Sequence, residues 1–211
     1  MAIISNAVTI ADAGAFSVGL GAQVLIKTLT ASNSATVSFV HGTNGVVLDS
    51  TYPIYKFELI SIHPSAANAY VSFNGTIDNT NYNVAKTSTT FYAYHGEGGG
   101  TSLTYSGGYD HAQGTGFQRI LFDNNSSDDD AGHCAELMLF NPSSTTFVKH
   151  FMCRTAGINT NDDGTTNPYC IDATIAGYFN TTSAITGIQF KMDNAGSLAT
   201  GAIKLYGIKD S

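Results

Sequence analysis

The feature of this sequence that most restricts its fold is a two-residue alternation of apolar and polar side chains, in short runs that turn residues separate. The longest run, IYKFELISIH at residues 54–63, places Tyr55 on one side of an extended chain and Lys56 on the other. Successive side chains of a β-strand point to opposite faces, so this period is typical of strands with one buried face. No run longer than a helical turn has the 3.6-residue period of an amphipathic helix. The pattern predicts an all-β protein.

Runs of this kind predict about a dozen short strands. Residues 23–30 and 35–41 are expected to form a hairpin. The Asn44-Gly45 step predicts a second hairpin, which turns the chain back into residues 46–48, because Asn-Gly accepts positive φ at little cost. The Gly-rich residues 96–116 are expected to form a long loop. The expected strands are residues 23–30, 35–41, 46–48, 54–63, 69–73, 91–94, 117–122, 134–140, 146–154, 169–179, 185–192 and 202–208.

Short strands with polar connections predict two packed antiparallel sheets, a β-sandwich of the jelly-roll type. We expect a single sandwich domain over residues 21–211, preceded by an N-terminal arm or first edge strand over residues 1–20. The sequence has no fixed-period repeat, which argues against a propeller or a solenoid.

The charge balance excludes two classes of partner. The 211 residues carry 9 Lys and Arg against 16 Asp and Glu, a formal net charge of -7, and the basic residues are scattered. Such a surface does not attract a phosphate backbone or an anionic membrane, so we expect neither nucleic acid nor membrane as a partner. Only 12% of the residues are charged, and uncharged polar residues and glycine take their place.

The compartment is inferred from the N-terminus and the cysteines. The first basic residue is Lys27, and no apolar stretch resembles a signal peptide or approaches a membrane span, so the chain is expected to be made in the cytoplasm. Cys134, Cys153 and Cys170 are odd in number and widely spaced, which predicts buried free thiols rather than disulfides.

Metal-binding patterns are weak. None of the six histidines stands in a zinc motif, and the adjacent pair His133-Cys134 is interpreted as the start of a strand. Asn159, Asn161 and Asp163 match the first half of a calcium loop, but Cys170 occupies the position that needs a bidentate Glu. An acidic run either shares a cation or is a solvated loop, and the loop is favoured. Its members are Asp123, Asp128, Asp129 and Asp130.

Signatures of catalysis are missing as well. The loop that starts at Gly96 lacks the Lys of a phosphate-binding loop, and no G-x-S-x-G elbow occurs. With Glu at only Glu58, Glu97 and Glu136, a glycosidase pair would need Asp or widely separated residues. We therefore expect no enzyme activity, no catalytic residue and no cofactor.

The remaining candidate is recognition by surface aromatics. Tyr92, Tyr94, Tyr105 and Tyr109 bracket the Gly-rich loop, and tyrosine rings beside Asn and Asp groups suit stacking on sugars. The alternative is that these rings pack inside the sandwich or at a subunit contact, which we favour because aromatic residues dominate cores and interfaces.

Two segments resemble a known family. These are LIKTLTASNSATVSFVHGTNGVVLDSTYPIYKFELISIHP at residues 25–64 and TGAIKLYGIK at residues 200–209. They resemble small virion structural proteins of tailed bacteriophages, especially phages of marine bacteria. The group usually ends on S-G-N-I-x-S-G-x-I-x-L-Y-G; residues 195–201 depart from it but keep Gly196 and Gly201. The resemblance implies an oligomeric β-sandwich on the capsid exterior or on tail appendages.

Two functions follow as hypotheses. The first is a non-enzymatic capsid decoration or cement protein that binds the major capsid protein or other virion proteins and self-associates, with a trimer favoured. The second is a tail-fibre or receptor-binding module that recognises host glycans through the tyrosines. The first is favoured because the chain shows no shaft or attachment region. In either case the protein is expected in the virion after synthesis in the host cytoplasm.

Overall fold

A computed structural model describes residues 3–5, 8–12, 15–16, 23–120, 127, 131–159 and 168–209. The described residues form strands and no helix. The strands are β1 (Ile3–Ser5), β2 (Val8–Asp12), β3 (Ala15–Phe16), β4 (Gln23–Thr30), β5 (Thr36–Val40), β6 (Ile54–Pro64), β7 (Tyr70–Thr76), β8 (Lys86–Gly96), β9 (Thr101–Tyr105), β10 (Gln118–Arg119), β11 (His133–Phe140), β12 (Lys149–Asn159), β13 (Tyr169–Phe179), β14 (Gly187–Asp193) and β15 (Leu198–Ile208).

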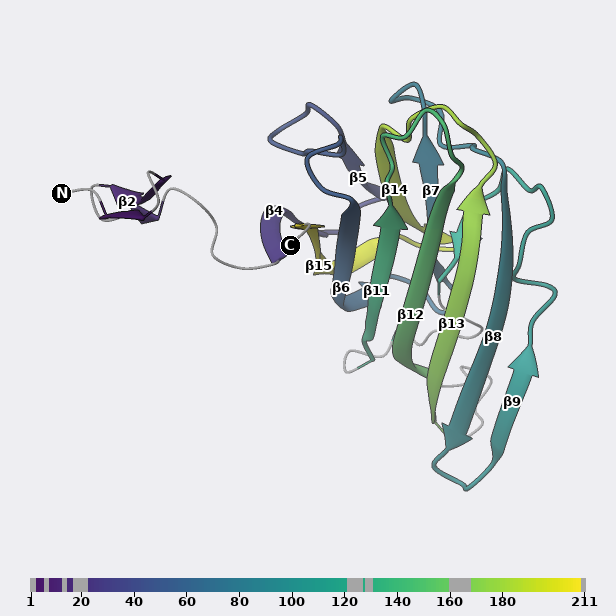
Figure 1. Ribbon diagram of the computed structural model, residues 1–211. Coiled ribbons are helices and arrows are strands. Elements are labelled where there is room, and N and C mark those ends of the chain that lie inside the picture. Colours follow the sequence, from purple (N-terminus) through teal and green to yellow (C-terminus); the bar gives the residue numbers. More distant parts are fainter. Residues whose placement is uncertain are drawn as a thin grey trace.

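Two antiparallel sheets pack face to face (Figure 1). The larger has eight strands in the order β4-β15-β6-β11-β12-β13-β8-β9, and the smaller has four in the order β10-β7-β14-β5. Strands β1 to β3 form a separate three-stranded sheet. The prediction of an all-β sandwich is confirmed, whereas the N-terminal arm stays a prediction.

The core lies between the two sheets and is rich in phenylalanine. Phe39 of β5 meets Phe57 of β6 edge to face, with ring centroids 5.3 Å apart. Phe190 of β14 also contacts Phe57, at 5.5 Å. All three are fully buried. Edge-to-face rings add about 0.5–1.5 kcal/mol per pair beyond the area that they bury, so these contacts help to hold the sheets together.

The larger sheet continues beyond β11 through β12, β13, β8 and β9, which we call the extension. The hairpin β8–β9 lies in the sequence between β7 and β10, and β12–β13 lies between β11 and β14. These two insertions meet in space, because β13 pairs with β8 along its whole length, from Tyr169 opposite Gly96 to Phe179 opposite Lys86. Figure 1 shows the extension as one side of the broad front sheet.

Three strand predictions were wrong. β4 and β5 are consecutive but lie in different sheets, so they form no hairpin. Residues 46–48 form no strand, so the second predicted hairpin does not form either, although Val46 and Leu48 are buried. The expected turn before them does form, with positive φ at Gly42 and Gly45. Strand β9 falls inside the predicted loop of residues 96–116. The prediction missed it because glycines at 98–100 and 107–108 flank this short run of β-forming residues and gave the whole segment a loop-like composition.

Candidate interaction surface

The outward face of the larger sheet, which we call the outer face, is the broadest candidate site. Directly opposed residues of paired strands share a face, so the pairing defines rows across the sheet. One row runs from Leu25 through Lys56 to Met152, and the next runs from Lys204 to Tyr105. The exposed large apolar side chains of this face are Leu25, Ile60, Phe91, Leu103, Tyr105 and Met152.

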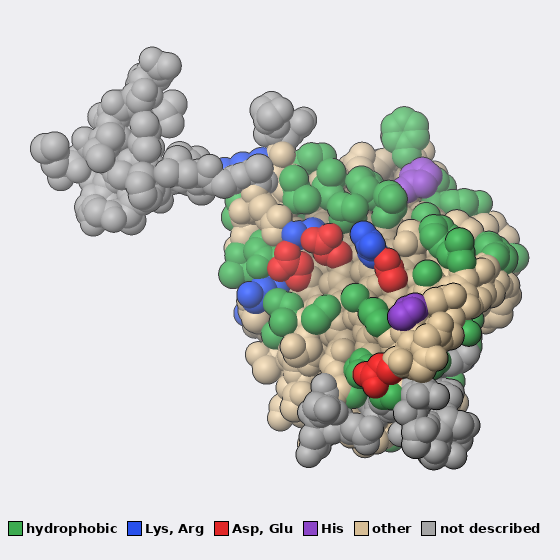
Figure 2. All heavy atoms as spheres, turned by 90° about the horizontal axis from the view of Figure 1, so that it is seen from below, with side chains coloured by type: hydrophobic (Ala, Val, Ile, Leu, Met, Phe, Trp, Pro, Cys, Tyr) green, Lys and Arg blue, Asp and Glu red, His purple; other side chains and the backbone are tan. Residues whose placement is uncertain are grey.

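Charged side chains in the middle of the outer face are paired with each other. Lys56 Nζ lies 2.6 Å from Glu58 Oε1 and 3.0 Å from Glu136 Oε1. Arg154 donates to both carboxylate oxygens of Asp172, at 3.1 and 2.7 Å. Figure 2 shows red and blue side chains side by side among green and tan ones.

These ion pairs lower the pKa values of the carboxylates that take part in them. The hydrogen bond from Lys56 lowers the pKa of Glu58, and the hydrogen bonds from Arg154 lower the pKa of Asp172. Lys204 lies beside Glu58 in the same row of the sheet. The middle of the face therefore holds three positive and three negative side chains, whereas the chain as a whole is strongly acidic. They are Lys56, Arg154, Lys204, Glu58, Glu136 and Asp172. This face is therefore close to neutral and presents little electrostatic barrier to another protein surface.

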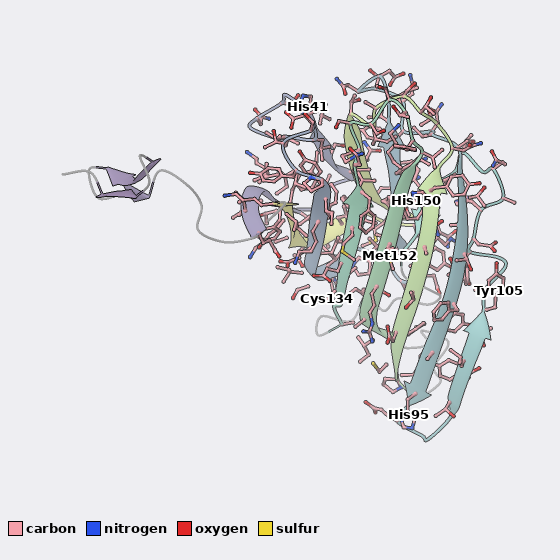
Figure 3. All side chains as sticks on the ribbon, in the orientation of Figure 1. His41, His95, Tyr105, Cys134, His150 and Met152 are labelled. Atoms are coloured by element: carbon pink, nitrogen blue, oxygen red, sulfur yellow. The ribbon has the colours of Figure 1, made fainter. Side chains whose placement is uncertain are left out.

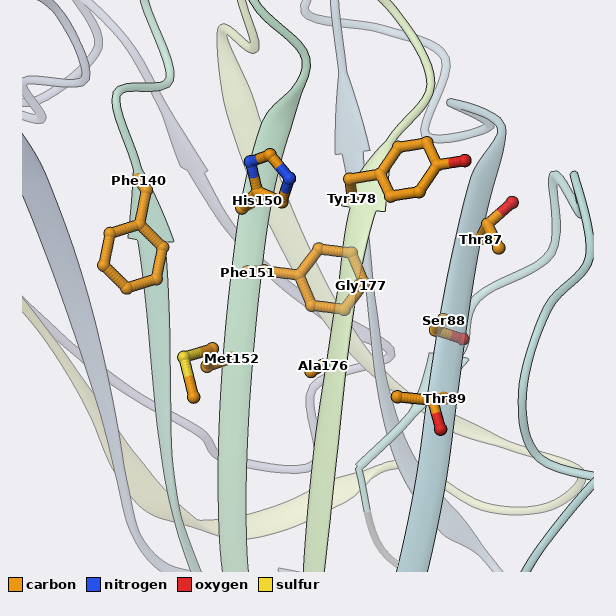
Figure 4. Close-up of a pocket in the computed structure, with 10 residues that line it drawn as sticks. All are labelled: Thr87, Ser88, Thr89, Phe140, His150, Phe151, Met152, Ala176, Gly177 and Tyr178. Atoms are coloured by element: carbon orange, nitrogen blue, oxygen red, sulfur yellow. The ribbon is translucent and has the colours of Figure 1, made fainter.

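A shallow apolar hollow of about 460 Å³ lies on the outer face over β11, β12, β13 and β8 (Figure 4). The small side chain of Ala176 forms its low centre, opposite Met152 on β12 and Thr89 on β8. His150 and Tyr178 stand at one end, with ring centroids 6.1 Å apart. Such a hollow fits an apolar side chain of a partner better than a charged substrate.

Two further hollows continue along the same face. One of about 520 Å³ includes Ile60 and the Arg154–Asp172 pair, and one of about 570 Å³ includes His95. Both are lined by Cys134 and Cys170, whose short side chains keep the surface low there. The outer face is thus a broad, shallow band with small residues at its low points, which suits contact with a protein more than enclosure of a small molecule.

The sequence-predicted tyrosines fall into two places. Tyr92, Tyr94 and Tyr109 are half-buried and pack with Tyr169 over Ile171 and Ala173, on the inward side of the extension. Tyr105 lies on the opposite, outer face, beside Phe91, and is 61% exposed. Figure 3 shows Tyr105 at the free side of the sheet. The four rings therefore do not form one surface.

The inward tyrosine cluster is held by specific contacts. The Tyr169 ring packs at a tilt against that of Tyr94, with ring centroids 5.1 Å apart, and its hydroxyl oxygen accepts a hydrogen bond of 2.6 Å from Asn159 Nδ2. The guanidinium of Arg119 lies 4.2 Å from the ring centre of Tyr70 and 4.9 Å from that of Tyr109. Sequence reasoning did not include Tyr169, because its place in the cluster depends on the pairing of β13 with β8, which brings it opposite Gly96.

Metal-binding geometry is not found in the part of the chain that the structure describes, which contains no group of three His, Cys, Asp or Glu side chains close enough to share an ion. Figure 3 shows His41, His95 and His150 far apart. His133 and Cys134 point to opposite faces, His133 buried and Cys134 exposed. The acidic run Asp123, Asp128, Asp129 and Asp130, and Asn161 and Asp163 of the calcium-like loop, lie outside the described residues.

The cysteines are free thiols, as predicted, but only one is buried. Burial raises the pKa of Cys153. Cys134 and Cys170 are exposed on the outer face, which corrects the prediction that all three are buried. Both occupy outward positions of their strands, so the alternation of neighbouring residues was the signal that located them.

His133 predicts an acid-sensitive fold. Its imidazole is buried, with Gly157 packed so closely that a Cβ there would lie 2.3 Å from Nδ1. Burial, and then the charge of His63, lower the pKa from 6.5 to about 4. The unfolded chain binds more protons between these values, so this stability is present above pH 6.5 and is lost as the pH falls to 4.

The size of this effect is about 3 kcal/mol at most. Urea unfolding at several pH values should show a smaller acid loss for His133→Leu than for the unmodified chain, by about that amount. Equal losses in the two proteins would contradict the assignment.

Comparison of the chain with protein-family models, with curated proteins and with solved structures finds no match. Among the described residues there is no helix of the length and apolar character needed to cross a membrane.

Proposed function

We propose that the protein is a non-enzymatic structural component of a tailed-phage virion, a decoration or cement protein that binds the outside of the capsid shell. The observation that carries the proposal is the outer face, which exposes large apolar side chains on β4, β6, β8, β9 and β12 and most of whose central charges are paired. Exposed apolar patches rimmed by polar residues mark protein interaction sites. The resemblance of residues 25–64 and 200–209 to phage virion proteins supplies the setting.

The strand order supports a jelly roll as the finer description of the sandwich. Without the extension, the larger sheet reads β4-β15-β6-β11 and the smaller reads β5-β14-β7-β10. The chain crosses between these two four-stranded sheets at most of its connections, and its first and last sandwich strands are neighbours. This order supports a jelly roll, a fold that recurs in viral capsid and lectin domains. Because a fold alone does not set a function, this adds support without deciding the role.

The partners in this proposal are the major capsid protein or other virion proteins, and further copies of the chain, with a trimer implied by the resemblance. Neither nucleic acid nor membrane is among the proposed partners. The chain would be made in the host cytoplasm and reach its place during virion assembly.

Quantitative mass spectrometry of purified virions tests the location. A decoration protein is expected in many copies, in a fixed ratio to the major capsid protein. A few copies per virion would instead indicate a tail component and overturn the decoration role.

The outer face is tested with two equally exposed residues. Met152 borders the hollow on β12 and Ile77 follows β7 on the other side of the sandwich, and each is 47% exposed. We expect Met152→Glu to weaken binding to undecorated capsids at least about tenfold, because it places a charge inside an apolar contact. Ile77→Glu is the matched control and should bind normally. Equal binding by both variants would exclude the hollow from the contact.

Glycan recognition in a tail-fibre or receptor-binding module is the second candidate. It is favoured by one observation: the exposed Tyr105 ring, whose hydroxyl donates a hydrogen bond to Asp110, which sets an aromatic surface beside a polar group. A glycan array should show binding that Tyr105→Ala abolishes. An array without binding would reject this candidate.

A further inference from the structure

Strand β9 ends the larger sheet, and no strand of the described residues pairs with its outer side (Figure 1). Hydrogen bonds from Gly96 N–H to Gly100 O, 2.8 Å, and from Ser106 N–H to Thr90 O, 2.9 Å, bracket its ladder with β8. Hydrogen-bonded pairs alternate with non-bonded pairs in an antiparallel ladder. Ser102 and Thr104 therefore bond to β8, and the residues between and beside them point their N–H and C=O groups away from it.

The free edge of β9 lacks the usual protection against pairing. Proteins commonly protect an edge strand with Lys, Pro or a bulge. The sequence of β9, TSLTY, contains no Lys and no Pro, and its pairing with β8 has no register shift. Leu103 is 75% exposed at its centre. The opposite edge differs, since β4 carries Lys27 and has a register shift against β15.

We propose that β9 pairs antiparallel with β9 of a second copy of this chain, centred on Leu103. Leu103 then faces Leu103 of the second copy, and Thr101 faces its Tyr105. These are the residues whose N–H and C=O groups point outward, so each facing pair exchanges both of its hydrogen bonds. The two eight-stranded sheets join into one continuous sheet, and their outer faces continue into each other.

Charge explains why a second copy fits this edge. The chain has a net charge of -7, so most approaches between two copies are repulsive. β9 has no charged residue, and Ala93 and Phe91, which lie opposite Leu103 and Tyr105 on β8, are uncharged. The ionisable groups beside this edge stand at its two ends: His95 opposite Thr101, and Asp110 on the Tyr105 hydroxyl. A two-fold contact brings the same patch together from both copies, which requires a surface that does not repel itself. The middle of this edge meets that requirement.

This inference deepens the self-association within the proposed function. Its test uses the purified full-length chain, whereas the virion location is tested by copy number, so the two can fail separately. The trimer that the resemblance implies is compatible with it, because a two-fold contact would then join two trimers.

The decisive variant is Leu103→Pro, measured by light scattering during size-exclusion chromatography. Proline removes an outward N–H and no bond to β8, so the chain's own ladder remains. We expect the unmodified chain to have twice the mass of this variant. Leu103→Thr, which keeps the N–H, should retain the doubled mass. A monomer or a trimer for the unmodified chain, or an unchanged mass for Leu103→Pro, would overturn the proposal.

Cross-linking gives a second measurement if the proline variant does not fold. The variant is Leu103→Cys in a chain that also carries Cys134→Ser and Cys170→Ser, and in the proposed pair its Cα lies about 5.5 Å from the same atom of the second copy. A short dithiol-reactive linker should join the two chains covalently. The control is Leu25→Cys in the same background, which lies on the opposite edge strand. Equal cross-linking of both variants would contradict pairing at β9.

Discussion

Replacing Phe73 with alanine is expected to lower the free energy of unfolding by about 3–5 kcal/mol. Phe73 of β7 is fully buried, and its ring centre lies 5.2 Å from that of Phe151 and 6.3 Å from that of Phe179. Those two rings come from the extension, so Phe73 joins the smaller sheet to it. Truncation leaves a cavity between two sheets whose backbones are fixed by their ladders and do not collapse to fill it.

Urea unfolding followed by circular dichroism measures this loss. Phe91→Ala is the matched control, because this substitution removes the same kind of ring from the outer face, where Phe91 is 46% exposed. Its loss is expected to be about 1 kcal/mol or less. Equal losses for the two variants would mean that Phe73 does not lie in the core.

Lys86 is expected to make the fold more stable as the pH rises from about 7 to 10.5. Its side chain is fully buried, and Nζ donates to the carbonyl oxygen of Gly116. No ion pair to Lys86 occurs among the described residues. Burial lowers its pKa from 10.5 to about 7. The unfolded chain therefore binds more protons in this interval, and the unfavourable burial of charge, present at and below pH 7, disappears above it.

The expected gain is roughly 3–5 kcal/mol over that interval. Lys86→Met removes the titrating group but keeps most of its apolar length, so its stability should lack this rise. The difference in unfolding free energy between the two proteins, followed with pH, isolates Lys86 from other titrating groups. If the free energies of unfolding of the two proteins change with pH in parallel, the Lys86 amine is accessible to water and the prediction is wrong.

The fold class could be predicted because alternation is local. Tyr55, Phe57 and Leu59 alternate in the sequence and are all buried. The assignment of strands to sheets could not be predicted this way, since it depends on contacts between distant residues. Ile188, for example, lies between Phe39 and Gly75 in the smaller sheet. The short connection between β4 and β5 predicted a hairpin, whereas the two strands lie in opposite sheets, on either side of the core.

The candidate site was less predictable than the fold. Sequence spacing grouped Tyr105 with Tyr92, although an odd separation along the chain and the turn between β8 and β9 put them on opposite faces. The outer face consists of residues from eight strands, and no short segment contains more than a few of them. In the sequence Met152 has no feature that distinguishes it from other strand residues, and its place in the hollow depends on the pairing of β12 with β11 and β13. Such a surface becomes visible only when the pairing is known.

The larger sheet is wider than the smaller one, so the strands that form most of the core differ from the strands that carry the surface features described above. Much of the core is formed by strands that would make a complete sandwich without the extension, while the hollow beside Met152, the tyrosine cluster and the open edge at Leu103 all use extension strands. Altering outward side chains of the extension therefore changes what the protein touches with little effect on whether it folds. A surface of this kind can be re-engineered for a new partner while the sandwich serves as a fixed support.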